Sequence, residues 1–217
     1  MTENTSQSPE REYIPGMGKP YLLPLYDVAH RVFGLHAIHQ RMITLAGLLA
    51  GHRVLDVGCG TGNLLRSTGK RHGDVELVGL DPDPKALARA RRKTRRAGVA
   101  VRLDRGFAQE LPYADDSFDR VFSSLMLHHL DSAAKDELLA EVLRVLRPGG
   151  LLILADAVFD KHGHEHRIRR PDLVHDNIGD GVAQRIAAAG FAVEPTRFMS
   201  MRIGGKVGIE LARAETR

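Results

Sequence analysis

Apolar residues along the chain follow two spacings that alternate. From about Tyr26 to Leu49 they recur every three or four residues, which predicts a helix. Beyond residue 50, short apolar runs alternate with stretches of helical spacing. The runs predict strands at 53–58, 75–81, 99–106, 118–127 and 150–158, and the other stretches predict helices at 64–72, 83–98, 133–150 and 178–190.

Strands that alternate with helices predict an α/β fold, in which a mostly parallel sheet carries helices on both faces. The run at 150–158 is almost continuously apolar, as expected of a strand covered on both faces. Residues 192–203 and 206–214 are expected to close the sheet as a C-terminal antiparallel hairpin. Ligands of such sheets bind beyond the carboxyl ends of the strands.

The 217 residues suffice for one sizeable domain. Residues 1–24 combine proline and glycine with polar side chains and are expected to form a flexible arm, with one domain at 25–217. No apolar run approaches the roughly 18 residues of a membrane span, and the first residues lack the apolar core of a signal peptide. The single cysteine, Cys59, excludes an internal disulfide. Together these features favour the cytoplasm.

The net charge of +4 is concentrated in one place, because residues 85–96 contain seven basic side chains and no acidic one. Such a segment is typical either of a nucleic-acid surface or of a solvated helix face. No aromatic side chains that could stack on bases are interleaved. The solvated face is therefore favoured, and a nucleic-acid partner is not expected.

The stretch RVLDVGCGTGNL (53–64) ends a strand with an acid and three alternating glycines. We expect Gly58, Gly60 and Gly62 to let backbone amides approach a ligand. A dinucleotide site would have a different glycine spacing, and Asp56 would repel a pyrophosphate. The carboxylate suits S-adenosylmethionine, which carries a sulfonium and an ammonium group. Asp81 ends the next strand, where an acid can accept both ribose hydroxyls.

Four motifs together resemble the class I S-adenosylmethionine-dependent methyltransferases. They are LDVGCGTG (55–62), VGLDPDP (78–84), ELPYADDSFDRVFSSLMLHHL (110–130) and VLRPGGLLILAD (145–156), so that the resemblance covers roughly residues 50–160. It implies a Rossmann-like, seven-stranded, mostly parallel sheet. The segment YDVAHRVFGLH (26–36) is similar to the lead-in of the quinone-biosynthesis C-methyltransferases.

The resemblance also implies which residues bind the cofactor. The methionine end of the cofactor would lie against Asp56, Gly58, Cys59 and Gly60, and its carboxylate would lie near Tyr26. The ribose would lie against Asp81, and the adenine against Pro82 and Ala108. The methyl group would lie above Ser123, Ser124 and Leu125. Phe107 stands where the family often has an acid that accepts the adenine amino group. Stacking by Phe107, or another acceptor, would have to replace that bond. Cys59 is expected to be a small packed side chain, not a catalytic one.

Three residues are candidates for a proton-accepting role: His128, His129 and Asp156. Methyl transfer mainly requires alignment of the acceptor and exclusion of water, but an acceptor with a high pKa also needs a base. Histidine titrates near neutral pH and suits that task. The structural alternative is that these histidines pack and cap the following helix.

A histidine-rich segment at 157–180 replaces the usual connection after the fifth strand. His162, His164 and His166 lie at two-residue spacing and are candidate substrate contacts. They would share a face and could ligate a metal if extended, but Gly163 makes a regular strand unfavourable, and no metal site is predicted. A lid over the acceptor pocket is the favoured interpretation.

The sequence therefore predicts an enzyme that transfers a methyl group from S-adenosylmethionine to a small-molecule acceptor, with the methylated atom (O, C or N) open. The acceptor pocket is expected between residues 13–39 and the insertion at 157–180, which favours a compact aromatic or quinone-like acceptor. The alternatives are an RNA methyltransferase that uses the basic segment, and a non-catalytic S-adenosylmethionine-binding protein. A monomer or homodimer is expected.

Overall fold

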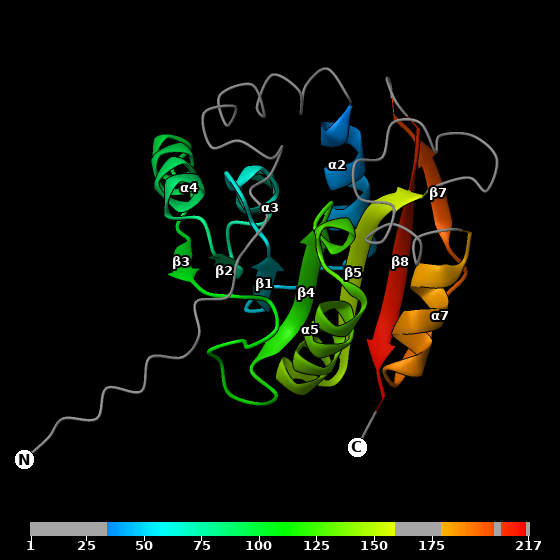
Figure 1. The fold of residues 1–217 in the computed structure, drawn as a ribbon. Helices are drawn as coiled ribbons and strands as arrows, with labels where there is room; N and C mark the ends of the chain where they lie inside the picture. Colours follow the sequence, from blue (N-terminus) through cyan, green and yellow to red (C-terminus); the bar gives the residue numbers. More distant parts are fainter. Residues whose placement is uncertain (1–33, 159–178, 202–204, 216–217) are drawn as a thin grey trace, which may run out of the picture.

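The computed structural model describes residues 34–158, 179–201 and 205–215. One mixed sheet runs through this part of the chain in the order β3-β2-β1-β4-β5-β8-β6, and β7 also pairs with β8 (Figure 1). The strands are β1 (Arg53–Val57), β2 (Glu76–Asp81), β3 (Arg102–Arg105), β4 (Phe118–Ser124), β5 (Leu146–Val158), β6 (Phe191–Val193), β7 (Arg197–Ser200) and β8 (Lys206–Ala214).

The first five strands are parallel, and β8 runs antiparallel to β5, β6 and β7. The predicted parallel sheet and closing hairpin are therefore confirmed. The sheet has eight strands instead of the predicted seven, because the segment after Gly190 forms two short strands, β6 and β7. Pro195 lies between them and has no backbone N–H to donate to a ladder, so pairing is interrupted there.

Helices cover both faces of the sheet, as predicted (Figure 1). One face packs against α2 (Leu35–Leu45), α3 (Asn63–Arg71) and α4 (Pro84–Arg96), and the other against η3 (Leu127–His129), α5 (Ser132–Val145) and α7 (Gly181–Ala188). Each face has its own apolar core, and residues of every central strand alternate between the two. None of the helices in the described ranges is long and apolar enough to cross a membrane.

Local chemistry sets where the helices begin and end. Asp83 accepts a hydrogen bond from the backbone N–H of Lys85 and caps α4, and Asp131 accepts one from Ala134 and caps α5. The predicted helix at 133–150 ends at Val145, because Leu146 already pairs with Phe118 as the start of β5. The predicted helix at 26–49 is described only from Gly34 onward and spans Leu35–Leu45 there.

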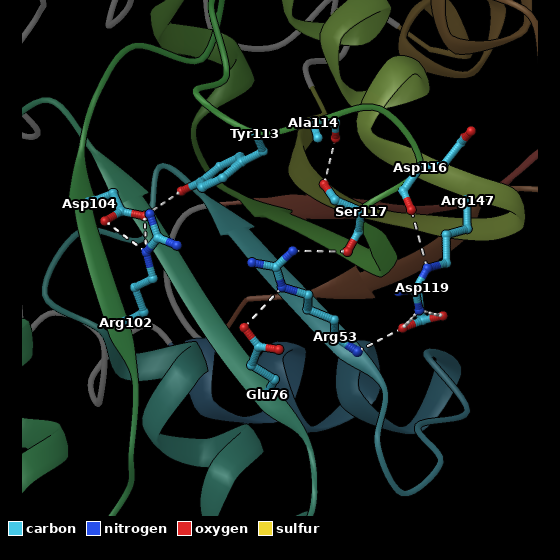
Figure 2. A network of polar contacts seen from close by, with 10 residues as sticks. All are labelled: Arg53, Glu76, Arg102, Asp104, Tyr113, Ala114, Asp116, Ser117, Asp119 and Arg147. Atoms are coloured by element: carbon cyan, nitrogen blue, oxygen red, sulfur yellow. Dashed lines mark hydrogen bonds and ion pairs between the residues drawn. The ribbon is translucent and has the colours of Figure 1, made fainter.

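Charged side chains join the amino-terminal ends of the strands (Figure 2). The backbone N–H of Arg53 donates to Asp119 Oδ2 at 2.7 Å, and Arg53 Nε donates to Glu76 Oε1 at 2.9 Å. Arg147 Nη1 lies 2.7 Å from both carboxylate oxygens of Asp119. These contacts tie β1, β2, β4 and β5 together at one edge of the sheet. The opposite edge, where the carboxyl ends of these strands meet, is left for the candidate site.

Candidate functional site

The glycine turn after β1 is anchored within the protein. The backbone N–H groups of Gly58 and Cys59 both donate to the Leu80 carbonyl at the end of β2, at 2.9 and 3.0 Å. The N–H of Gly60 donates to Asp81 Oδ2 at 2.8 Å, and that of Gly62 donates to the Cys59 carbonyl. Each of these amides therefore has an acceptor within the chain, and the approach of a ligand to this turn stays a prediction.

The glycines are needed for space and for backbone conformation. Gly60 and Gly62 have φ values of +52° and +73°, which favour glycine. A Cβ on Gly62 would lie 2.9 Å from Cβ of Ala90, so a side chain there would push α3 and α4 apart. A Cβ on Gly60 would meet nothing within 4 Å. The backbone of Gly60 is thus open to a ligand, whereas Gly62 serves helix packing.

A pocket opens beside this turn between β1, β4, α2 and α3. It is lined by His39, Asp56, Gly58, Cys59, Gly60, Thr61, Asn63, Leu64 and Ser124. The predicted cofactor residues Asp56, Gly58, Cys59, Gly60 and Ser124 are therefore brought together. Burial raises the pKa of the Cys59 thiol, whose side chain packs in the core beneath α2–α4, in line with a packing role.

Asp56 is the group in the pocket that most clearly points to a ligand. Its side chain is only 2% exposed, and it has no hydrogen bond or ion pair to any residue in the described ranges. Burial, and secondly the charge of Asp81, raise the pKa of the Asp56 carboxyl well above its ordinary value. A bound ammonium group would restore the ionised form, so the pocket fits the amino group of S-adenosylmethionine.

Asp81 has a structural role that the sequence did not reveal. Its Oδ2 accepts the N–H of Gly60 and its Oδ1 accepts the N–H of Asp83 at 2.9 Å, so it joins the glycine turn to the start of α4. Burial raises the pKa of Asp81 despite these two hydrogen bonds. Each carboxylate oxygen can accept more than one hydrogen bond. Binding of ribose hydroxyls by Asp81 stays a prediction.

The predicted adenine contacts lie close to the end of β2. The N–H of Gly106 reaches the Asp81 carbonyl at 3.4 Å, which brings the following residues Phe107 and Ala108 to this strand end. Ala108 is buried in the core on the α5 side, whereas Phe107 and Pro82 are partly exposed. Stacking of adenine on Phe107 therefore remains compatible with the structure and stays a prediction.

Ser123 and Ser124 at the end of β4 were both predicted to contact the cofactor, but they have different surroundings. Ser124 lines the pocket, whereas Ser123 Oγ is buried, has no partner among the described residues and does not line it. Leu125 has a φ of +54°, which is unfavourable for a residue with a side chain, and its N–H donates to the Ala155 carbonyl at 2.8 Å. Backbone strain of this kind is frequent where a strand end shapes a binding site.

His128 and Asp156 form a pair, with His129 beside it. His128 Nδ1 lies 2.5 Å from Asp156 Oδ1, and the two imidazole rings are 4.1 Å apart. Burial by itself lowers the pKa of His128, but the Asp156 carboxylate outweighs burial and raises it above the ordinary value. Burial, and secondly the charge of His128, lower the pKa of His129 to about 4. A neutral His129 is a weak base at neutral pH.

These three candidate bases do not line the pocket at Asp56. In β5, Leu152 and Leu154 face the α5 side of the sheet, and alternation places Asp156 on the same side. Asp56, by contrast, belongs to the α2 side. Lys135 of α5 is completely buried, and its charge opposes protonation of His128. The structure thus brings His128, His129 and Asp156 together, and their catalytic role stays a prediction.

Several predicted residues lie outside the described ranges. They are Tyr26, His162, His164 and His166. Within the described ranges there is no group of three or more His, Cys, Asp or Glu residues that could hold a metal ion. Four residues line the pocket without having been predicted from the sequence: His39, Thr61, Asn63 and Leu64. A signal existed for His39, since it occupies a position of helical spacing that elsewhere in α2 is apolar.

The basic segment 85–96 forms most of α4. Ala86, Leu87, Ala90 and Thr94 face the core, and the arginines at 91, 92, 95 and 96 are exposed. None of these arginines lines the pocket. This arrangement is the one expected of a solvated helix face.

The chain is similar to several proteins that are named as methyltransferases. Residues 54–150 match the family model described as a methyltransferase domain. The chain is 42% identical to methyltransferase GfsG of Streptomyces halstedii over 115 residues. These aligned residues cover 50% of this chain and 39% of that protein. It is 36% identical over 138 residues to demethylmenaquinone methyltransferase of Deinococcus radiodurans, with coverage of 62% and 56%.

A third relative is the ubiquinone/menaquinone biosynthesis C-methyltransferase UbiE of Chromobacterium violaceum, 35% identical over 135 residues, with 60% of this chain and 54% of that protein covered. The chain thus spans about half the length of these curated relatives. Among solved structures, a SAM-dependent methyltransferase from Aquifex aeolicus has a TM-score of 0.71 at 22% identity, covering 90% and 98% of the two chains. The [4+2]-cyclase SpnF has a TM-score of 0.72 at 21% identity, covering 83% and 81%.

Proposed function

We propose that the chain is a class I S-adenosylmethionine-dependent methyltransferase that transfers the methyl group of S-adenosylmethionine to a small-molecule acceptor, which the match of residues 54–150 to a methyltransferase domain and the methyltransferase relatives support. The observation that carries the proposal is Asp56, a buried carboxylate without a partner among the described residues, beside the open backbone of Gly60. One fold neighbour is a cyclase, so the fold alone does not determine the reaction and turnover has to be measured.

Two pocket residues, together with Asp81 outside the pocket lining, would each hold a different part of the cofactor. Asp56 would bind the ammonium group, and the open face at Gly60 would admit the methionine chain. Asp81, already fixed by two backbone N–H groups, would receive the ribose hydroxyls with little further ordering. The bound cofactor supplies an activated methyl group on a sulfonium. The protein then has to exclude water, align the acceptor and remove its proton.

The acceptor class follows from the relatives and from the region available for it. One relative is named a demethylmenaquinone methyltransferase and another a ubiquinone/menaquinone biosynthesis C-methyltransferase, which supports an aromatic or quinone-like acceptor. The insertion at 157–180, which the sequence predicts to be a lid over that acceptor, lies outside the described ranges except for residues 157, 158, 179 and 180. We place the reaction in the cytoplasm, with a monomer or homodimer as the working form.

Calorimetry with S-adenosylmethionine and S-adenosylhomocysteine tests the cofactor site. We expect micromolar binding to the full chain, weakened at least tenfold in Asp56→Asn, because the amide cannot neutralise an ammonium group. Glu76→Gln is the matched control, since Glu76 lies exposed at the amino end of the neighbouring strand. Absence of binding to the wild type would contradict the proposal.

Turnover on a panel of reduced quinones and phenols tests the reaction itself. Formation of S-adenosylhomocysteine and of a methylated product is the expected result. Full cofactor binding without turnover on any panel member would instead favour a non-catalytic binding protein. Methylation of RNA that disappears when Arg91, Arg92, Arg95 and Arg96 are changed to alanine would favour the RNA alternative.

A further inference from the structure

We propose that His39, acting together with Ser124, is the base that accepts the proton of the methyl acceptor. This inference rests on the proposed methyl transfer and names a residue and an acceptor class for it. His39 Nε2 lies 3.2 Å from Ser124 Oγ, and both residues line the pocket that contains Asp56. The acceptor would be a phenol or hydroquinone, whose hydroxyl proton has to be removed.

The sheet register places the pair next to the expected methyl position. Asp56 of β1 is the direct neighbour of Phe122 of β4, and Ser124 lies two residues further toward the carboxyl edge. Successive residues alternate between faces, so Asp56 and Ser124 share one face of the sheet. If Asp56 holds the ammonium end of the cofactor, Ser124 lies beyond it, at the edge from which an acceptor approaches.

His39 reaches this position from a different element. It belongs to α2, which packs across β5, and the other buried residues of that helix are all apolar: Leu35, Ile38, Met42 and Ile43. The His39 side chain is only 6% exposed. An imidazole on such a helix face is unfavourable unless its nitrogens are used. A hydrogen bond to Ser124 alone would also satisfy Nε2, so a purely structural role is the alternative that the experiment must exclude.

The histidines of η3 are less well placed for the same task. Neither His128 nor His129 lines the pocket. Asp156 already engages the backbone N–H and Nδ1 of His128. His39 is therefore the histidine that the described structure puts into direct contact with the end of β4 inside the pocket.

The acceptor oxygen, or the ring carbon of the enol form, attacks the methyl carbon, and the carbon–sulfur bond breaks with its electron pair left on sulfur. The hydroxyl proton of the acceptor passes to Ser124 Oγ while the proton of Oγ passes to His39 Nε2. The imidazolium later releases this proton to water. The step requires a neutral His39 that carries its proton on Nδ1. Because a protonated imidazole cannot accept a proton, kcat should fall as the pH drops below the pKa of His39, and this fall is the acid limb of the pH profile.

The test uses the full chain and the variants His39→Asn and Ser124→Ala. His36→Asn is the matched control, because His36 is exposed on the same helix. The substrate probe is a reduced demethylmenaquinone analogue with a short side chain. We expect His39→Asn to lower kcat roughly 100-fold, to abolish the acid limb, and to leave the affinity for S-adenosylhomocysteine within threefold of the wild type. Ser124→Ala should lower kcat in the same direction.

Two results of that experiment would overturn the proposal. Turnover of His39→Asn within threefold of the wild type would mean that the imidazole is structural. A tenfold loss of S-adenosylhomocysteine affinity would make His39 a cofactor ligand and not a base. His129→Asn and His128→Asn, measured in parallel, show whether an η3 histidine carries the acid limb instead, which would also overturn it.

A second measurement does not depend on the acceptor. Histidine-selective NMR of the protein saturated with S-adenosylhomocysteine should show His39 titrating between about pH 5 and 8, with its tautomer altered by Ser124→Ala. An imidazole that keeps one protonation state across that range would refute the proposal. Failure of the wild type to bind S-adenosylhomocysteine, by contrast, would refute the proposed function, and the titration of His39 could still be measured on the unliganded protein.

Discussion

Asp156 holds His128 by two hydrogen bonds. Its Oδ2 accepts the backbone N–H of His128 at 2.9 Å, and its Oδ1 lies 2.5 Å from Nδ1 of the same residue. The two contacts fix η3 against the carboxyl end of β5 and orient the imidazole with Nε2 as its remaining titratable nitrogen. Either role of the pair, as a base or as a clamp, depends on the same carboxylate.

Asp156→Asn should destabilise the protein by about 2 kcal/mol, because a buried hydrogen bond to a charged group is weakened. The raised pKa of His128 fixes the sign of the pH dependence. The charged pair contributes stability that is fully present below the unfolded pKa of about 6.5 and is lost as pH rises through the higher folded pKa. Urea unfolding should therefore show a larger difference between wild type and variant at pH 6 than at pH 9.

Asp136→Asn is the control for that measurement, because Asp136 pairs with Arg185 on the exposed face of α5. We expect its effect to stay below about 1 kcal/mol. A difference between wild type and Asp156→Asn that did not vary between pH 6 and pH 9 would show that the His128–Asp156 contact is not an ion pair.

His129 should give the opposite pH dependence. Its pKa is lowered to about 4, so between about pH 4 and 6.5 the imidazole is neutral in the folded protein but protonated in the unfolded chain. Its contribution to stability is present above the unfolded pKa of about 6.5 and falls as pH drops from there toward 4. Unfolding measured between pH 7 and 4.5 should be less pH-dependent in His129→Leu, by up to about 1 kcal/mol per pH unit. An unchanged slope in the variant would contradict the buried, neutral state.

Asp81→Asn should weaken cofactor binding at least tenfold. The amide loses the charge that favours ribose hydroxyls, and one of the bonds to the N–H groups of Gly60 and Asp83 becomes a repulsive contact or forces the side chain to turn. Calorimetry with S-adenosylhomocysteine gives the affinity, and urea unfolding gives the stability of the same samples. Asp104→Asn at the neighbouring strand β3 is the control for the affinity. Unchanged affinity in Asp81→Asn would exclude a role in ribose binding.

Gly60→Ala and Gly62→Ala should separate binding from stability. Gly60 has open space around it, so alanine costs only about 1 kcal/mol for its positive φ but blocks the approach of a ligand. Gly62→Ala adds a clash with Ala90 and should cost about 3 kcal/mol. Gly98 also has a positive φ and lies in open space beyond α4, so Gly98→Ala measures the loss of stability that the backbone conformation alone causes. Urea unfolding gives the stability of the three variants, and calorimetry gives their affinity for the cofactor. Normal cofactor binding by Gly60→Ala would contradict the assignment of Gly60 to binding and of Gly62 to stability.

Local patterns in the sequence were enough to determine the fold class and the position of the glycine turn. The alternation of apolar runs with helical spacing reflects burial on each element, and each element shows it independently of the others. The glycines at 58–62 and the acids at 56 and 81 could be placed for the same reason, since they stand at strand ends that the pattern itself marks.

The tertiary structure decided which side chains meet. His39 and Ser124 are 85 residues apart in the chain, and no local pattern relates them. Alternation predicts that Ser123 and Ser124 face opposite sides of the sheet, but it does not say which of them faces the pocket. The amides of Gly58, Cys59 and Gly60 also found acceptors in β2, a neighbouring strand. Such contacts depend on how separate elements pack together, because hydrogen-bond partners are chosen by distance in space and not by spacing along the chain.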